Sequence, residues 1–250
     1  MGQPIPTITK NLLIINGLFF LATIVFQYKG IDLSVLLGAF YPGSPNFNSW
    51  QIITHMFMHG GFSHILFNMF SLWMFGSVVE NTIGEKNFIK LYLMAGLGGF
   101  FLFNLVNYFD VQQIQQLVEA DGISLAEVYK ASKLNAAGEL INQTTAEVAN
   151  NANAIKLAQQ YVTPMVGASG AIFGLLIAFA VLFPNAKLAL IFFPVGIKAK
   201  YFIPLLIGYE LFMGVRGYEW NNIANFAHLG GALIGFLYIR NWKNKMFRKN

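Results

Sequence analysis

The chain has 250 residues, of which 56% are hydrophobic and 11% are charged, and its formal net charge is +5. Because an average soluble domain carries about 25% charged residues, this composition excludes an ordinary soluble protein and indicates a protein of the lipid bilayer. The chain has no cysteine, which excludes disulfides and a thiol nucleophile, and its basic residues are scattered between apolar runs, so the charge does not indicate a nucleic-acid partner.

Six apolar segments follow one another along the chain, and a bilayer-spanning helix takes about 20 residues. The predicted spans are residues 12–26, 62–83, 88–108, 165–183, 202–215 and 223–239. We therefore predict an all-α membrane protein, a bundle of six transmembrane helices that forms one domain over residues 1–250.

Two connecting segments are long. Residues 27–59 form a moderately apolar loop between the first two spans. Residues 110–161, between the third and fourth spans, are rich in Ala, Gln, Asn, Glu and Lys and contain no run long enough to cross a bilayer. Helix-forming residues and a weak apolar periodicity predict that this polar insertion is helical and lies outside the membrane.

Lys and Arg residues concentrate on one side of the predicted bundle. If the N-terminus is inside, 11 of the 16 basic residues fall in cytoplasmic segments. Because cytoplasmic loops carry an excess of Lys and Arg, we expect both termini in the cytoplasm and the insertion outside. A basic tail, the absence of cysteine and a first span that reads as a retained anchor favour a bacterial inner membrane, with an organelle membrane as the open alternative.

Ser169 is the first candidate for chemistry, because it lies among small residues in the sequence Gly-Ala-Ser-Gly at 167–170, near the outer end of the fourth span. Small residues at this spacing also allow membrane helices to pack closely, so packing is the competing interpretation. A nucleophile at a helix N-terminus would have its own amide directed at a developing oxyanion.

A nucleophilic serine needs a base, and the sixth span offers His228. Two glycines follow it at helical spacing, Gly231 and Gly235, and the fourth span carries a similar pair. If these glycine faces pack together, Ser169 and His228 come within hydrogen-bond reach. A lone histidine in a span can also be structural or relay protons.

The second span carries His64 and Asn68, which share one helix face because they are four residues apart. Both can donate hydrogen bonds to an oxyanion, or can bond a neighbouring helix instead. His55 and His59 are also four apart, but a membrane zinc protease needs a glutamate beside the first histidine, and none is present. We therefore expect no metal and no other cofactor.

Glu210 in the fifth span is a further costly polar residue inside the membrane. We expect a structural role for it, with the carboxyl group protonated or accepting hydrogen bonds from tyrosine or backbone donors. A transporter that uses Glu210 and the histidines as a relay is an alternative, but the two halves of the chain show no convincing repeat.

Taken together, these residues resemble the rhomboid family of intramembrane serine proteases. The matching residues are His59-x4-His64-x3-Asn68, Glu80-x3-Gly84, Gly167-Ala168-Ser169-Gly170 and Ala227-His228-Leu229-Gly230-Gly231. The resemblance covers most of the chain apart from the insertion. It implies a six-helix bundle with a water-filled cavity open to the outside.

The resemblance also implies roles for single residues. Ser169 would be the nucleophile and His228 its base, in a dyad without a carboxylate. His64, Asn68 and the Ser169 amide would form the oxyanion hole.

Four further residues would support this site. His59 would order the loop before the second span, and Phe173 would pack on the catalytic imidazole. Gly167 and Gly231 complete the two small-residue motifs. Substrates would be single-span membrane proteins, cut near their outer ends. A catalytically silent relative that binds membrane clients is the other function that we weigh.

Overall fold

The computed structural model describes residues 4–190, 193–216 and 224–247. The chain forms two compact units, each built from separate stretches of sequence. Unit 1 comprises Met1–Ile15, Ser63–Phe103 and Ala168–Asn250, and unit 2 comprises Asn16–Phe62 and Asn104–Gly167.

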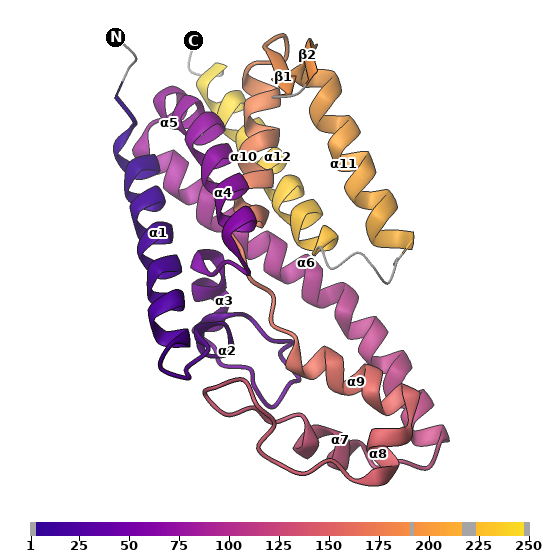
Figure 1. Ribbon diagram of the computed structural model, residues 1–250. Coiled ribbons are helices and arrows are strands. Elements are labelled where there is room, and N and C mark those ends of the chain that lie inside the picture. The colour runs from indigo at the N-terminus through magenta and orange to yellow at the C-terminus, as the bar shows by residue number, and fades with distance from the viewer. Residues whose placement is uncertain (1–3, 191–192, 217–223, 248–250) are drawn as a thin grey trace. The chain divides into compact units, whose positions relative to one another are not determined.

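Helices dominate the described residues, and the only strands among them form one short antiparallel hairpin (Figure 1). The elements are α1 (Thr7–Gln27), α2 (Leu33–Leu37), α3 (Gln51–Thr54), the 3-10 turn η1 (His55–Phe57), α4 (Phe62–Ser71), the π-helical turn η2 (Leu72–Gly76), α5 (Ser77–Ile83), α6 (Glu85–Ala120), α7 (Leu125–Ala131), α8 (Ala146–Asn150), α9 (Ala152–Val162), α10 (Ser169–Leu182), β1 (Lys187–Leu190), β2 (Phe193–Lys198), α11 (Ala199–Arg216) and α12 (Asn225–Phe247).

Each predicted span falls on a helix. Three helical runs of the described chain are long and apolar enough to cross a membrane: α1, the run Phe62–Ile83 and α6. The predicted fourth span contains the shorter apolar helix α10, the fifth lies within α11, and the sixth overlaps α12, which continues to Phe247. Ile223, the predicted start of the sixth span, lies outside the described residues.

Several helix ends differ from the prediction by a few residues, and three differences change the fold more. Helix α6 continues past residue 108 to Ala120, because apolar side chains such as Val111 and Val118 stay on one face and are buried against the rest of unit 2. Residues 165–168 are not helical, because Met165 exchanges backbone hydrogen bonds with Ala39 in an isolated bridge. The β1–β2 hairpin replaces the short loop expected after the fourth span.

The insertion packs on the first long loop within unit 2. Asn46 donates from Nδ2 to the Ser132 carbonyl at 2.8 Å, and Ser44 donates from Oγ to the Tyr161 carbonyl at 2.6 Å. The Asp32 amide donates to the Ala136 carbonyl at 2.8 Å. Residues 110–161 therefore fold together with the loop of residues 27–59.

One end of unit 1 gathers several helix termini. Glu80, in α5, accepts hydrogen bonds from the Ile8 and Thr9 amides at 2.9 and 2.7 Å, and so caps the first turn of α1 with a negative charge. Lys243, late in α12, reaches the Val181 carbonyl at the end of α10. The start of α1 and the ends of α5, α10 and α12 thus lie at one end, and Ser169 lies at the opposite end of α10.

Helices α10 and α12 lie side by side (Figure 1), and glycines line their contact. A Cβ atom on Gly231 would overlap the carbonyl oxygen of Gly170. A Cβ on Gly235 would lie 2.5 Å from the Cα of Gly174. Backbone therefore packs on backbone, which fixes the distance between the first turns of the two helices.

We expect Gly231→Val to destabilise the fold by about 3 kcal/mol, because the added side chain has no space to enter at the helix contact. Thermal unfolding of the purified protein in detergent measures the effect. Gly208→Ala on α11 is the matched control, since a Cβ there meets nothing within 4 Å. A Gly231→Val protein that unfolds at the wild-type temperature would contradict the close helix contact.

Candidate active site

Ser169 is the first residue of α10, and its side chain is half-buried. The helix begins here because the chain turns at Gly167, whose φ of 131° is rarely adopted by residues with a side chain. Backbone amides in the first turn of a helix have no partner within the helix. The Ser169 amide therefore belongs to a set of donors that an anion can use.

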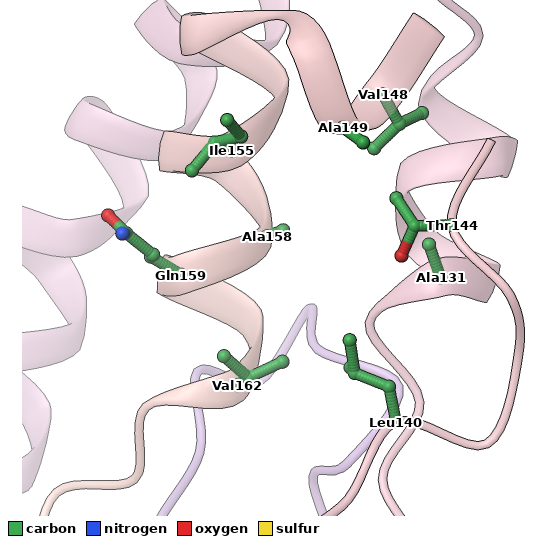
Figure 2. A pocket seen from close by; sticks show the side chains of 9 residues that line it. All are labelled: Ala131, Leu140, Thr144, Val148, Ala149, Ile155, Ala158, Gln159 and Val162. Atoms are coloured by element: carbon green, nitrogen blue, oxygen red, sulfur yellow. The ribbon is translucent and has the colours of Figure 1, made fainter. Parts of the chain in front are cut away.

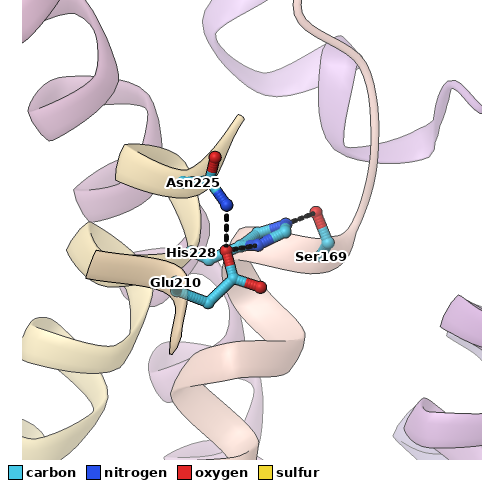
Figure 3. A network of polar contacts seen from close by, with 4 residues as sticks. All are labelled: Ser169, Glu210, Asn225 and His228. Atoms are coloured by element: carbon cyan, nitrogen blue, oxygen red, sulfur yellow. Dashed lines mark hydrogen bonds and ion pairs between the residues drawn. The ribbon is translucent and has the colours of Figure 1, made fainter. Parts of the chain in front are cut away.

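The Ser169 hydroxyl lies 2.8 Å from Nε2 of His228, which α12 supplies (Figure 3). His228 is 9% exposed, and its ring stacks on Phe173 with 4.2 Å between ring centroids and 4° between ring planes. Phe173 lies one turn after Ser169 on α10. The same helix thus supplies the hydroxyl and the surface against which the imidazole is held flat.

The other ring nitrogen of His228 has a carboxylate partner. Glu210 on α11 lies with Oε2 at 2.9 Å from His228 Nδ1, and Asn225 donates from Nδ2 to the same oxygen at 2.6 Å. Figure 3 shows the resulting row of Asn225, Glu210, His228 and Ser169. The predicted dyad did not include this carboxylate, which reaches the ring because α11 packs on α12.

The row of contacts suits one direction of proton transfer. An ionised Glu210 can only accept, and Nδ1 of His228 then carries the proton and donates toward it. Nε2 is then unprotonated and accepts the hydrogen bond of the Ser169 hydroxyl. This arrangement can remove the serine proton as the oxygen attacks an electrophilic carbon.

Asn68 and His64 lie one turn apart on α4, also in unit 1. Asn68 is buried, and its Nδ2 makes no hydrogen bond to any residue that the structure describes. Because an unsatisfied buried donor costs about 1–3 kcal/mol, Asn68 is a donor that an incoming acceptor can satisfy.

The two earlier histidines belong to unit 2, and both are buried. His55 donates from Nδ1 to the Gln51 carbonyl at 2.8 Å, and burial lowers the pKa of His55 to about 4. His55 is therefore neutral at pH 7 and serves the structure of the loop. Among the residues described, no cluster of three or more His, Asp or Glu could hold a metal ion.

Unit 2 contains a separate pocket of about 300 Å³ (Figure 2). It is lined by Ala131, Leu140, Thr144, Val148, Ala149, Ile155, Ala158, Gln159 and Val162. None of these lining side chains ionises. Thr144 supplies the only hydroxyl among them, and no histidine lines the pocket to act as its base. The pocket therefore has no group for acid–base chemistry, and the row from Ser169 to Asn225 is the candidate active site.

Comparisons with known proteins identify the family to which the chain is similar. A family model described as "Rhomboid domain" matches residues 46–112 and 138–242. Over 190 residues the chain is 28% identical to "Rhomboid protein 1, mitochondrial" of Saccharomyces cerevisiae, covering 75% of this chain and 40% of that protein. It is 28% identical over 195 residues to "Presenilin-associated rhomboid-like protein, mitochondrial" of Mus musculus, covering 76% of this chain and 38% of that protein.

A plant relative, "RHOMBOID-like protein 12, mitochondrial" of Arabidopsis thaliana, is 26% identical over 216 residues, which cover 85% of this chain and 53% of that protein. The chain thus spans about half or less of the length of these relatives. Their names contradict the predicted bacterial inner membrane with cytoplasmic termini. The prediction was wrong because charge bias and cysteine content report the side of a membrane and its redox state, not which membrane it is.

Proposed function

The chain belongs to the rhomboid family, and on this premise we propose that it is an intramembrane serine endopeptidase. The observation that carries the proposal is the 2.8 Å hydrogen bond between the Ser169 hydroxyl and Nε2 of His228 at the first turn of α10. The substrates would be single-span membrane proteins in a lipid bilayer. By analogy with the names of its relatives, the membrane would be a mitochondrial one.

The proposed architecture has six membrane-crossing helices: α1, the run Phe62–Ile83, α6, α10, α11 and α12. The insertion of residues 110–161 would lie outside the bilayer. Water must reach the site for hydrolysis, and the substrate must expose a peptide bond that a stable helix hides. Cleavage would therefore occur near the membrane face where α10 begins, in helices with Gly, Ala, Ser or Pro.

The chemistry begins when Oγ of Ser169 attacks the scissile carbonyl carbon and its proton passes to Nε2 of His228. The carbonyl oxygen becomes an oxyanion that accepts hydrogen bonds from the Ser169 amide, Asn68 and His64. The C–N bond breaks, the imidazolium gives its proton to the leaving amine, and an acyl-enzyme remains. Water, deprotonated by His228, then hydrolyses the ester and restores Ser169.

Cleavage by the purified protein in liposomes tests the proposal. The substrate is a tagged single-span protein with a Gly/Ala-containing helix, and its matched control carries Leu at the same positions. We expect a product from the first substrate only, with a new end near one membrane face. Binding of several substrates by folded protein without any product would contradict proteolysis and favour a silent client-binding relative.

We expect Asn68→Ala to lower kcat by about 10²- to 10³-fold with little change in KM, because its amide would bond the oxyanion and not the ground state. The kinetics of the liposome assay measure both constants. Asn87→Ala is the matched control, since Asn87 lies at the other end of unit 1 and donates to the Ile83 carbonyl. A kcat within threefold of wild type for Asn68→Ala would remove it from the oxyanion hole.

A further inference from the structure

Three helices contribute to the row of polar contacts at Ser169. Helix α10 supplies Ser169, α12 supplies His228 and Asn225, and α11 supplies Glu210. Glu210 is 6% exposed, although a carboxylate inside the apolar helix α11 is costly unless it is well paired. Its position is therefore explained by the groups around it.

Two hydrogen-bond donors meet the same oxygen of Glu210, Oε2. Asn225 approaches at 2.6 Å and His228 Nδ1 at 2.9 Å. Asn225 lies one turn before His228 on α12, so one helix face offers both donors. The carboxylate is thus held at the ring nitrogen that faces away from Ser169.

Close packing leaves the carboxylate little freedom. Gly214 follows Glu210 by one turn on α11, and a Cβ there would lie 3.2 Å from Cβ of Asn225 and 3.2 Å from Phe226. Met213, next to it, is also buried. Helix α11 therefore lies against the first turn of α12 at the level of the histidine.

We propose that Glu210 is a positioning residue of the proposed protease, the third member of a Ser169–His228–Glu210 triad in which Asn225 holds the carboxylate. The inference rests on the proposed function of Ser169 and His228. Glu210 keeps the proton of His228 on Nδ1, directs Nε2 to the Ser169 hydroxyl and stabilises the imidazolium that forms during attack. Sequence reasoning assigned it only a structural role.

The competing explanation is that Glu210 merely fastens α11 to α12. Glu210→Gln separates the two, because a glutamine oxygen in the place of Oε2 still accepts from Asn225 and from Nδ1 of His228 but carries no negative charge to stabilise the imidazolium. If Glu210 only fastens the two helices, Glu210→Gln keeps its activity. If Glu210 positions and stabilises His228, Glu210→Gln loses activity.

Labelling with a fluorophosphonate measures the effect without a protein substrate. In this reaction the Ser169 oxygen forms a bond to phosphorus, fluoride leaves with the P–F bonding pair, and the serine proton passes to His228. We expect Glu210→Gln to slow labelling, and kcat for cleavage, by about 10²- to 10⁴-fold with KM nearly unchanged. We expect Glu210→Asp to restore part of the rate.

Met213→Ala is the matched control on α11, because it removes a buried side chain three residues after Glu210 and leaves the carboxylate in place. It should lower the unfolding temperature and leave kcat within a few-fold of wild type. If Glu210→Gln does not fold, Asn225→Ala replaces it, with labelling expected to slow by about tenfold.

Labelling by folded Glu210→Gln, or by Asn225→Ala, at the wild-type rate would overturn the triad and leave the protease proposal intact. Slower labelling by the variant, with no cleavage of any substrate by wild type, would support the triad while the proposed function fails. The two proposals therefore fail in different experiments.

Discussion

Ser169→Ala is expected to lower the rate of substrate cleavage by about 10⁶-fold, to the level of protein-free liposomes, because no other group would form the acyl-enzyme. The hydroxyl is the only oxygen at hydrogen-bond distance from Nε2 of His228 among the contacts of the described residues. Alanine removes that oxygen and keeps a good helix former at the start of α10, so the fold should survive.

Ser71→Ala serves as the control for Ser169→Ala, since Ser71 ends α4 in the same unit and belongs to no part of the proposed site. Both variants are compared with wild type in the liposome assay, with unfolding temperatures measured in parallel. Residual cleavage by folded Ser169→Ala above about 1% of wild type would assign the nucleophile to another residue.

His228→Phe is expected to be as inactive as Ser169→Ala, with a loss of about 10⁶-fold. Phenylalanine keeps an aromatic ring for Phe173 to stack on, where the present centroid distance is 4.2 Å, but it removes both nitrogens. Ser169 then has no base, and Glu210 loses its ring partner.

The double variant Ser169→Ala/His228→Phe is the sharper test of His228. If the two residues act as one unit, the double variant loses no more activity than either single variant. Single-turnover cleavage in liposomes gives the rates. Losses that multiply in the double variant would contradict a shared catalytic step, and so would a folded His228→Phe protein with more than about 1% of wild-type activity.

Hydropathy and residue spacing were sufficient to predict much of unit 1. Apolar runs located the helices that begin at Thr7, Phe62 and Glu85, because a membrane helix must be apolar for most of its length. The glycine spacing on the fourth and sixth spans predicted their close packing, since only glycine permits backbone contact. That packing is the reason why Ser169 and His228 could be paired before the structure was known.

Contacts between helices could not be predicted where the sequence has no residue spacing that indicates a packing face. Glu210 has no motif around it, and the resemblance to the family suggested a dyad. A physical signal did exist: a carboxyl group inside an apolar helix needs a buried partner, and His228 is the one histidine in the following span. The lack of a pattern linking the two helices prevented the pairing.

Tertiary contacts also decided two boundaries that hydropathy misplaced. Met165 is apolar, and the sequence therefore extended the fourth span to it, but its backbone pairs with Ala39 from a segment more than a hundred residues away. Helix α6 continues to Ala120 because Val111 and Val118 find an apolar cluster outside the predicted span. Both effects depend on tertiary partners that a window of sequence does not contain.

The most direct test of the central claim is mass spectrometry of the purified wild-type protein after reaction with a fluorophosphonate. We predict one phosphonyl adduct, located on Ser169, and none in the His228→Phe variant. An adduct on a different serine would contradict the assignment of Ser169 as the nucleophile. Substrate cleavage by a protein that is not labelled at Ser169 and does not need Ser169 would contradict it as well.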